Sequence, residues 1–237
     1  ALGRRAACRY RDPMVVGDVD PATDPASGRL AALVRDGLRG GFLGALPAAA
    51  AERLLAEAIR INVPAGSVVY RDEELPQLLV VVSGLLRIFV SSPDGRQVTV
   101  RYAHSGDVAG LALVVGGPAP MSIQAMTPAL LVALRTDTLR ALLATDPGVA
   151  RACAEELSRQ VHQLLVDVAE QAFLPVRQRL VRQLLVLAQR GPRRHLVVAA
   201  SQQELADAIG SVREVVTRTL HQLHEERLVR VGRGGRR

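Results

Sequence analysis

The feature that most constrains the fold is a short pattern that occurs twice, Ser201-x-x-Glu204 and then Ser211-x-x-Glu214. A serine followed three residues later by a glutamate is the capping box of a helix start, in which each side chain binds the other residue's backbone amide. Between the two boxes there is room for one short helix, and Gly210 suits a tight turn. The sequence therefore predicts two helices joined by a glycine-containing turn, a helix-turn-helix.

The second of these helices is predicted to run from Val212 to about Glu226. Its apolar stripe is Val215, Val216, Leu220 and Leu223, and its outer side carries Arg213, Glu214, Thr217, Arg218 and His221. In a helix-turn-helix the second helix lies in the major groove of DNA, with its N-terminal side chains at the base edges. There Arg213 can donate two hydrogen bonds to guanine, and Glu214 can accept one from cytosine. At the helix starts, the side chains placed to contact phosphates are Ser201, Gln202, Gln203 and Ser211.

The charge distribution favours the same interpretation. Residues 176–237 hold thirteen arginines against five acidic residues, whereas the rest of the chain is close to neutral. A basic segment on a neutral body is typical of a nucleic-acid-binding module, because bound phosphates release their counterions. Two alternatives stay open: a solvated basic tail, and a pair of ordinary exposed charges at Arg213 and Glu214, with Glu214 serving only as a cap.

Upstream, the sequence predicts helices and then short strands. Residues 30–58 have a helical pattern, broken at Leu46-Pro47. Between Val63 and Leu134, short apolar runs alternate with turn signals, and the candidate strands are 63–70, 77–84, 85–92, 97–103 and 130–136. Strands at this spacing favour a small antiparallel barrel or jelly roll, a body that commonly encloses a pocket.

A long helix is predicted from Pro147 to about Phe173. Its apolar positions Leu157, Val161, Leu164, Val168 and Ala172 recur at alternating steps of four and three residues, the spacing of a coiled-coil seam. Such a seam needs a partner helix. The alternative is that the stripe rests on the chain's own barrel.

Taken together, these motifs resemble the bacterial cyclic-AMP receptor and fumarate-nitrate-reduction regulator (CRP/FNR) family of transcription factors, over about residues 55–234. The resemblance is carried by VPAGSVVYRDEEL, VVVSGLLRIFV and PDGRQVTVRYAHSGDVAG in the first part, and by FLPVRQRLVRQLL and IGSVREVVTRTLHQLHEERLV in the second. It implies an α+β fold with a cyclic-nucleotide-binding-like β-barrel, a dimerisation helix and a winged helix-turn-helix. Arg213, Glu214 and Arg218 stand where that family's base-reading residues stand.

The resemblance also implies an organisation and partners. The expected domains are a disordered tail (1–28), a sensor barrel with N-terminal helices (29–145), a dimerisation helix (146–174) and the DNA-binding domain (175–237). A homodimer is expected to bind a palindrome with half-sites about one helical turn apart and a core like the family's TGTGA. RNA polymerase is an expected partner if the protein activates transcription. The terminal GRGGRR leaves little length for a second wing strand.

The family pattern places a candidate effector pocket at Gly110, Leu111, Val114, Met121, Ser122, Leu164 and Leu165. Members that bind cyclic AMP carry a glutamate and an arginine where this chain has Leu111 and Met121. Burying a phosphate without a charge partner costs several kcal/mol, so the effector is expected to be something other than cyclic AMP, or absent. No cofactor or metal site is predicted, and His104 and His162 are more often ordinary histidines than haem ligands.

Other function classes find less support. The two cysteines are far apart, which favours a reducing cytoplasm, and no apolar run approaches the roughly 20 residues of a membrane span. No catalytic motif is present at the required spacing, so an enzyme is not expected. The competing hypothesis is a ligand-binding regulatory module whose basic C-terminal part contacts a protein or RNA partner.

Overall fold

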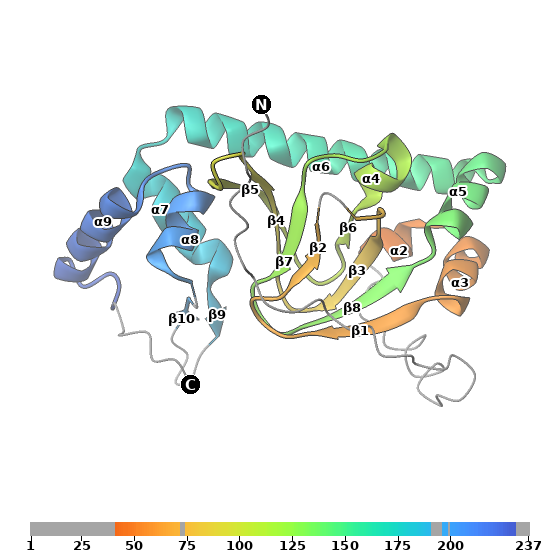
Figure 1. The fold of residues 1–237 in the computed structure, drawn as a ribbon, viewed down its shortest axis with the longest axis horizontal. Helices are drawn as coiled ribbons and strands as arrows, with labels where there is room; N and C mark the ends of the chain where they lie inside the picture. Colours follow the sequence, from red (N-terminus) through yellow and green to blue (C-terminus); the bar gives the residue numbers. More distant parts are fainter. Residues whose placement is uncertain (1–40, 72–73, 191–195, 199, 231–237) are drawn as a thin grey trace, which may run out of the picture.

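The computed structural model describes residues 41–71, 74–190, 196–198 and 200–230 (Figure 1). The strands are β1 (Ile59–Val63), β2 (Val68–Tyr70), β3 (Leu78–Ser83), β4 (Leu86–Ser91), β5 (Gln97–Ala103), β6 (Val108–Ala109), β7 (Ser122–Ala125), β8 (Ala129–Leu134), β9 (Gln189–Arg190) and β10 (Leu196–Val197). The helices are α2 (Phe42–Ala45), α3 (Ala48–Ala56), α4 (Leu111–Gly116), α5 (Thr136–Thr145), α6 (Pro147–Phe173), α7 (Val176–Leu187), α8 (Gln202–Ala208) and α9 (Arg213–Glu225). The predicted fold class is confirmed, while the tail expected over residues 1–28 lies outside the described residues.

Two four-stranded antiparallel sheets form the barrel, with strand orders β1-β8-β3-β6 and β2-β7-β4-β5. Their inner faces meet in one cluster of Val63, Val69, Tyr70, Leu79, Val81, Leu86, Ile88, Ala103, Ala109, Leu113, Ile123, Ala125, Ala129 and Leu131. Alternating strand residues point to opposite faces, which is why the apolar positions of each strand converge here. Hydrocarbon therefore fills the space inside the barrel.

The predicted strand positions were right for β3, β4, β5 and β8 and wrong elsewhere. The single strand expected over 63–70 is two strands, because Gly66 turns the chain at a φ of +84° between β1 and β2. Strand β1 starts at Ile59, directly after the stretch that was expected to be helical, and neither β6 nor β7 was predicted. Strand β7 has only four residues and is held by pairing with both β2 and β4, a tertiary contact that local periodicity does not reveal.

A second apolar core joins the helices to one end of the barrel. It contains Phe42, Leu54, Leu78, Leu111, Val114, Leu139 and Val149 among its buried members. Helix α6 begins here with Pro147 at its first position, and the Asp146 carboxylate accepts from the amides of Gly148 (2.8 Å) and Val149 (3.4 Å). The bounds predicted for this helix agree with the observed ones.

The two halves of α6 are buried differently. In the N-terminal half Val149, Ala152 and Cys153 are at most 2% exposed. From Glu156 onward the side facing the rest of the molecule is polar and is formed by Glu156, Gln160, Gln163, Asp167 and Glu170. The exposed side of the C-terminal half is apolar: Val161, Leu165 and Val168 are 53%, 62% and 63% exposed.

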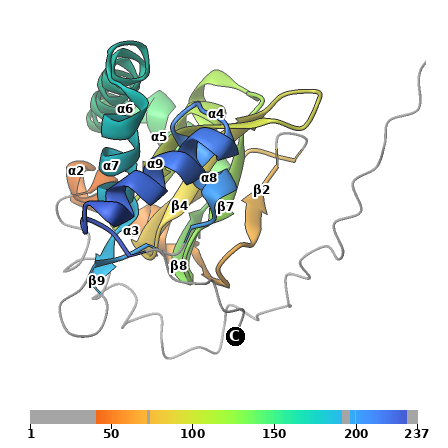
Figure 2. The same cartoon turned by 90° about the vertical axis from the view of Figure 1, so that its left-hand side faces the viewer.

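Beyond α6 lies what we call the reading module, which comprises α7, β9, β10, α8 and α9. Helix α7 ends at Leu187, and Gln189 and Arg190 then pair with β10. Residues 228–230, which follow α9, form no strand, and residues 231–237 lie outside the described residues. Figure 2 looks at the molecule from the end that carries this module, with α9 foremost and α6 receding behind it.

Candidate nucleic-acid interface

The first predicted capping box is present at the start of α8. The Glu204 amide donates to the Ser201 Oγ at 3.1 Å, and the Ser201 amide donates to the Glu204 Oε2 at 2.6 Å. Two backbone amides that a helix start leaves without partners are thereby satisfied. Helix α8 is fixed at its N-terminus, and Ser201 and Gln202 are held beside the start of α9.

The second predicted capping box is not formed, which corrects the interpretation of Ser211-x-x-Glu214. Helix α9 starts one residue later than expected, with Val212 as its N-cap and no side-chain cap. Gly210 takes a φ of +60° in the turn, and the Ser211 amide donates to the Ala206 carbonyl at 2.9 Å. Because Ser211 is used by the turn, Glu214 is the second helical residue rather than the third, and the register that the box requires is lost.

The two faces of α9 agree with the sequence pattern. Val216, Thr219, Leu220 and Leu223 are buried, and Arg213, Glu214, Thr217, Arg218 and His221 are exposed. Thr219 was not predicted to be inside; its hydroxyl donates to the Val215 carbonyl at 2.8 Å, and this bond makes its burial possible. The apolar face packs against Leu205, Ile209 and Leu180 of the module's own core.

Several predicted contact residues are brought together on the outer surface of the module. The Thr217 hydroxyl lies 2.7 Å from the Gln202 Oε1 and 2.9 Å from the Arg213 carbonyl, which joins the start of α8 to the first turn of α9. Gln203 instead binds Asp207 along its own helix, at 2.8 Å. Ser201 is exposed and Ser211 is half-buried.

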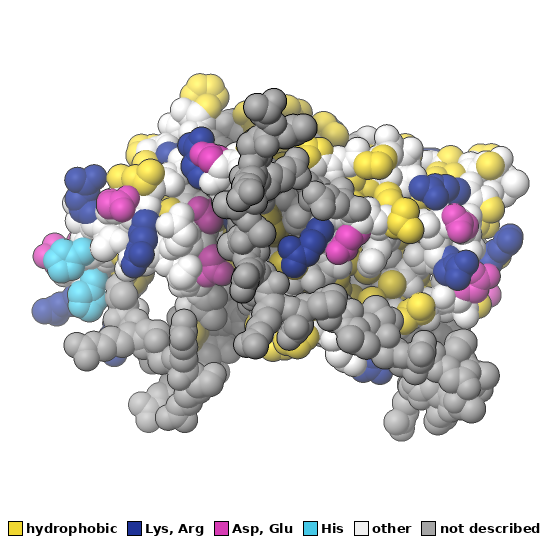
Figure 3. Space-filling view, viewed as in Figure 1, with side chains coloured by type: hydrophobic (Ala, Val, Ile, Leu, Met, Phe, Trp, Pro, Cys, Tyr) yellow, Lys and Arg dark blue, Asp and Glu magenta, His cyan; other side chains and the backbone are white. Residues whose placement is uncertain are grey.

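Arginine side chains of this surface are available for an anionic partner. Within the part of the chain that the structure describes, neither Arg213 nor Arg218 has a carboxylate within 4 Å. Figure 3 shows arginine and histidine side chains at the end of the molecule formed by α9. In contrast, Arg177 forms a bidentate pair with Glu226 (2.7 and 2.5 Å), which ties α7 to the end of α9 and lowers the pKa of the Glu226 carboxyl.

The residues of the candidate effector pocket are divided between different environments. Leu111 and Val114 are buried in the core under α5 and α6, whereas Met121 packs against the cluster inside the barrel. Leu164 is half-buried on α6, and Leu165 is exposed. Gly110, directly before α4, takes a φ of +86°. Ser122 of β7 pairs with Phe89 of β4. Leu113 of α4 was not among the predicted pocket residues. Its side chain packs into the cluster inside the barrel and is 0% exposed.

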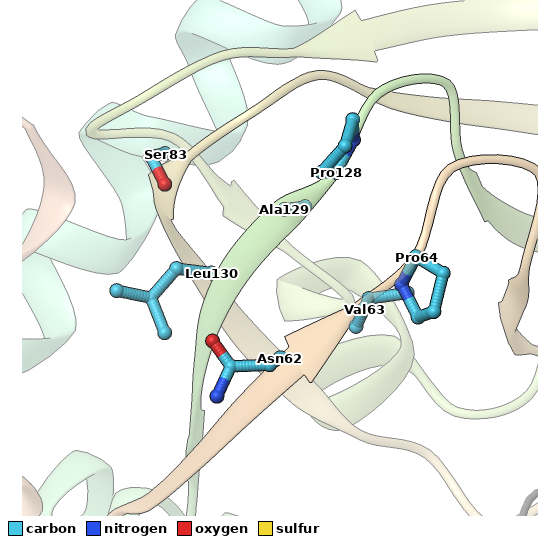
Figure 4. Close-up of a pocket in the computed structure, with 7 residues that line it drawn as sticks. All are labelled: Asn62, Val63, Pro64, Ser83, Pro128, Ala129 and Leu130. Carbon is cyan, nitrogen blue, oxygen red and sulfur yellow. The ribbon is translucent and has the colours of Figure 1, made fainter.

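Two hollows lie elsewhere on the molecule. One of about 390 Å³ is an open depression against β1 and β8, lined by Asn62, Val63, Pro64, Ser83, Pro128, Ala129 and Leu130 (Figure 4). The other, of about 450 Å³, is a polar cleft between β5, α6, α7 and the end of α8. His104 lines this cleft, in a turn where the Asp107 Oδ2 accepts a hydrogen bond from the His104 amide at 2.8 Å. His162 is exposed on α6.

Comparison with known protein families gives two matches. Residues 60–146 match the cyclic nucleotide-binding domain, and residues 178–237 match the Crp-like helix-turn-helix domain. The second match covers α8 and α9, the two helices that carry the predicted contacts. In the described residues, no helix has the length and apolar character needed to cross a membrane.

Individual relatives agree with these matches. The chain is 29% identical over 188 residues to the CRP-like cAMP-activated global transcriptional regulator of Mycobacterium tuberculosis, covering 76% of this chain and 84% of the relative. It is 31% identical over 163 residues to the transcriptional regulator LdrP of Thermus thermophilus, with coverage of 67% and 80%. Among solved structures it is similar to the c-di-GMP responsive global regulator CLP of Xanthomonas campestris (TM-score 0.66, 25% identity, coverage 78% and 96%).

Proposed function

The chain belongs to the CRP/FNR family of transcription factors, and from this premise we propose that it acts as a homodimer that reads a palindromic DNA site. As members of this family do, it joins a cyclic nucleotide-binding domain to a DNA-binding helix-turn-helix. Homologues of the chain are transcription regulators, not enzymes. We propose the division into a barrel (29–145), a dimerisation helix (146–174) and a DNA-binding domain (175–237).

The single observation that carries the dimer is the exposed apolar side of α6. Val161 and Val168 are more than half exposed, while Leu157 and Leu164 of the same seam are half-buried. Exposed apolar side chains at heptad spacing favour a second helix with the same spacing, which removes them from water. A twofold axis beside this stripe pairs the two helices and places one reading module on each side of the dimer.

Within each module we propose that Arg213, Glu214 and Arg218 contact bases, and that Thr217, Ser211, Ser201, Gln202 and Gln203 contact or position the DNA backbone. All are exposed except Gln202 and Ser211, which are half-buried. The unpaired guanidinium of Arg213 can form the two parallel bonds to guanine that give the strongest direct readout. A half-site like TGTGA supplies that guanine.

For the effector, we propose that the protein responds to a molecule other than cyclic AMP, or to none. Leu111 is 1% exposed where cyclic-AMP-binding members place a carboxylate, and the cluster in which the two sheets meet is built from apolar side chains. An anionic phosphate placed among these side chains lacks a charge partner. Native mass spectrometry of the purified dimer tests this, with cyclic AMP and c-di-GMP added separately, because the relatives respond to these two nucleotides; stoichiometric cyclic AMP binding contradicts the proposal.

Fluorescence anisotropy with a palindrome of two TGTGA half-sites tests the DNA-binding proposal. We expect tighter binding to the palindrome than to a scrambled duplex of equal length, with two chains per duplex. Equal affinity for both duplexes contradicts it and favours a module whose basic part contacts RNA or protein.

If the protein activates transcription, we propose that it also contacts RNA polymerase. We also propose a cytoplasmic location.

A further inference from the structure

A buried arginine lies where the barrel meets the reading module. Arg87 of β4 is 2% exposed. Its Nε donates to the Thr99 Oγ1 at 2.8 Å, its Nη1 donates to the Gln97 Oε1 at 3.0 Å, and its guanidinium lies 4.8 Å from the centre of the Phe89 ring. All three partners belong to the barrel, and all three are uncharged. The barrel alone therefore satisfies part of the hydrogen bonding of this guanidinium and none of its charge.

The counter-charge comes from the reading module. The Asp207 Oδ2 of α8 lies 3.8 Å from the Arg87 Nη2, and no other carboxylate of the described residues comes within 4 Å of that guanidinium. The Nη2 is buried and has no hydrogen-bond partner among the residues that the structure describes. Since a buried cation without an opposite charge is strongly unfavourable, moving α8 away from β4 leaves Arg87 uncompensated.

The surrounding contacts hold the same interface together without charge. Leu85, directly before β4, is buried in the hydrophobic cluster of the reading module, and the Gln183 amide donates to the Tyr102 hydroxyl at 2.8 Å. These contacts keep the module close to the barrel. Arg87 and Asp207 add a requirement on where along the barrel α8 sits, because their attraction depends on the distance between one atom pair.

Helix α8 connects this contact to the reading surface. Asp207 is near its C-terminal end, and Gln202, at its start, meets Thr217 of α9. A dimer on a palindrome must present two reading helices at a fixed separation, so a module held in place needs less ordering on binding than a freely moving one. Arg87 contacts none of the residues proposed to bind DNA and acts through Asp207. The Asp207 Oδ1 also accepts from the Gln203 Nε2 at 2.8 Å, and an asparagine at 207 keeps an oxygen acceptor for that bond.

We propose that Arg87 and Asp207 are positioning residues that set the placement of the reading helices for a palindromic site. This inference rests on the proposed DNA-binding function. It predicts a loss that is specific to two-site binding, because a single half-site places no demand on the separation of the two modules.

The test compares Asp207→Asn with the wild-type chain on a palindrome and on an isolated half-site. We expect about tenfold weaker binding to the palindrome and unchanged binding to the half-site, a coupling of ordinary size for neighbouring charged groups. Removing a negative charge near DNA by itself strengthens phosphate binding, so electrostatics with DNA predicts the opposite sign. Asp207→Glu is expected to restore palindrome binding. The matched control is Glu155→Gln, which breaks an exposed pair with Arg151 at 3.9 Å and is expected to bind as the wild type does.

Hydrogen exchange supplies a second readout. In Asp207→Asn we expect faster exchange in α8 and in the facing β4 and β5, with no change in α5, whereas a general loss of stability accelerates exchange everywhere. The double variant, Arg87→Gln with Asp207→Asn, is expected to bind the palindrome at least as tightly as whichever single variant binds it less tightly. If the wild type prefers the palindrome and Asp207→Asn binds the palindrome as tightly as the wild type does, the positioning role is wrong. If the wild type shows no palindrome preference, the proposed function itself has failed.

Discussion

The two halves of α6 belong to one unbroken helix and follow opposite packing rules. In the first half, Val149 and Cys153 turn inward and complete the core that closes the barrel. In the second half, the inward side carries Gln163 and Asp167 at a polar cleft, and the valines at 161 and 168 face outward. The first half is satisfied within the chain, and the second leaves an apolar surface that a second chain can cover.

This difference teaches how to separate folding from assembly in this protein. A residue in the first half contributes to the stability of the monomer, because its neighbours belong to the same chain. A residue on the exposed stripe of the second half is expected to contribute to association, because in the proposed dimer its neighbours come from the second chain. The same type of substitution in the two halves is therefore expected to have different consequences.

The largest expected effect is that of Val149→Asp. Val149 is 0% exposed, and a carboxylate placed in this core loses its hydration without gaining a partner. We expect a loss of about 4 kcal/mol or more in the free energy of unfolding. Urea denaturation followed by circular dichroism measures it. The matched variant Val168→Asp is expected to leave the unfolding of the monomer almost unchanged, and equal losses in both variants contradict the comparison.

Val168→Asp is expected instead to break the dimer. Two carboxylates placed near the twofold axis repel each other and replace apolar contacts, which weakens association by about 2–4 kcal/mol. Sedimentation equilibrium measures the dissociation constant of the dimer. Binding to the palindrome is expected to weaken as the dimer dissociates. If Val168→Asp remains a dimer at concentrations where the wild type is a dimer, the interface lies elsewhere.

Arg213→Ala tests base recognition by the reading module, which follows the second half of α6 in the chain. Because Arg213 is exposed, its loss is expected to leave folding and dimerisation intact and to cost about 1–3 kcal/mol in binding at one base position. Anisotropy with duplexes substituted at each position of the half-site measures the change. Arg140→Ala, at an exposed site on α5, serves as the control. A uniform loss over all sequences indicates a phosphate contact instead.

The smallest effect concerns thiol chemistry. Burial, followed by the charge of Glu156, raises the pKa of the Cys153 thiol from 9.0 to about 11. The folded state therefore favours the protonated thiol, so this stabilisation is complete below pH 9 and is lost as the pH rises toward 11. In a Cys8→Ser background we expect slow alkylation of Cys153 at pH 8 in the native protein and fast alkylation of the same thiol at pH 8 in concentrated urea, which unfolds the chain. Mass spectrometry over time measures both rates, and rapid modification of native Cys153 contradicts its burial.

Much of this fold could be predicted from periodicity. The steps of four and three residues identified the long helix α6, and the alternation of apolar residues gave β3, β4, β5 and β8. The elements that were missed, β6, β7 and β1, are short or follow a helical pattern, and pairing with neighbouring strands specifies them. Periodicity reports local preference, and long-range pairing overrides it in short segments.

At the candidate interface, side-chain exposure could be predicted and hydrogen-bond register could not. The outward residues of α9 followed from its apolar stripe, and the box at Ser201 followed from spacing alone. The box at Ser211 failed because the turn at Gly210 takes up the Ser211 amide, a contact made with Ala206 of the preceding helix. The pair of Arg87 and Asp207, 120 residues apart in the sequence, carried no local signal at all.

The uncapped start of α9 has a consequence for protein engineering. Val212 leaves the first amides of the helix without a side-chain acceptor, and Val212→Ser is the substitution that normally stabilises such a start. Yet a hydroxyl there would occupy the donors that an oncoming phosphate oxygen can use. We therefore expect Val212→Ser to raise the thermal stability of the chain and to weaken its binding to DNA. At this one position, stability and DNA binding place opposite demands on the side chain.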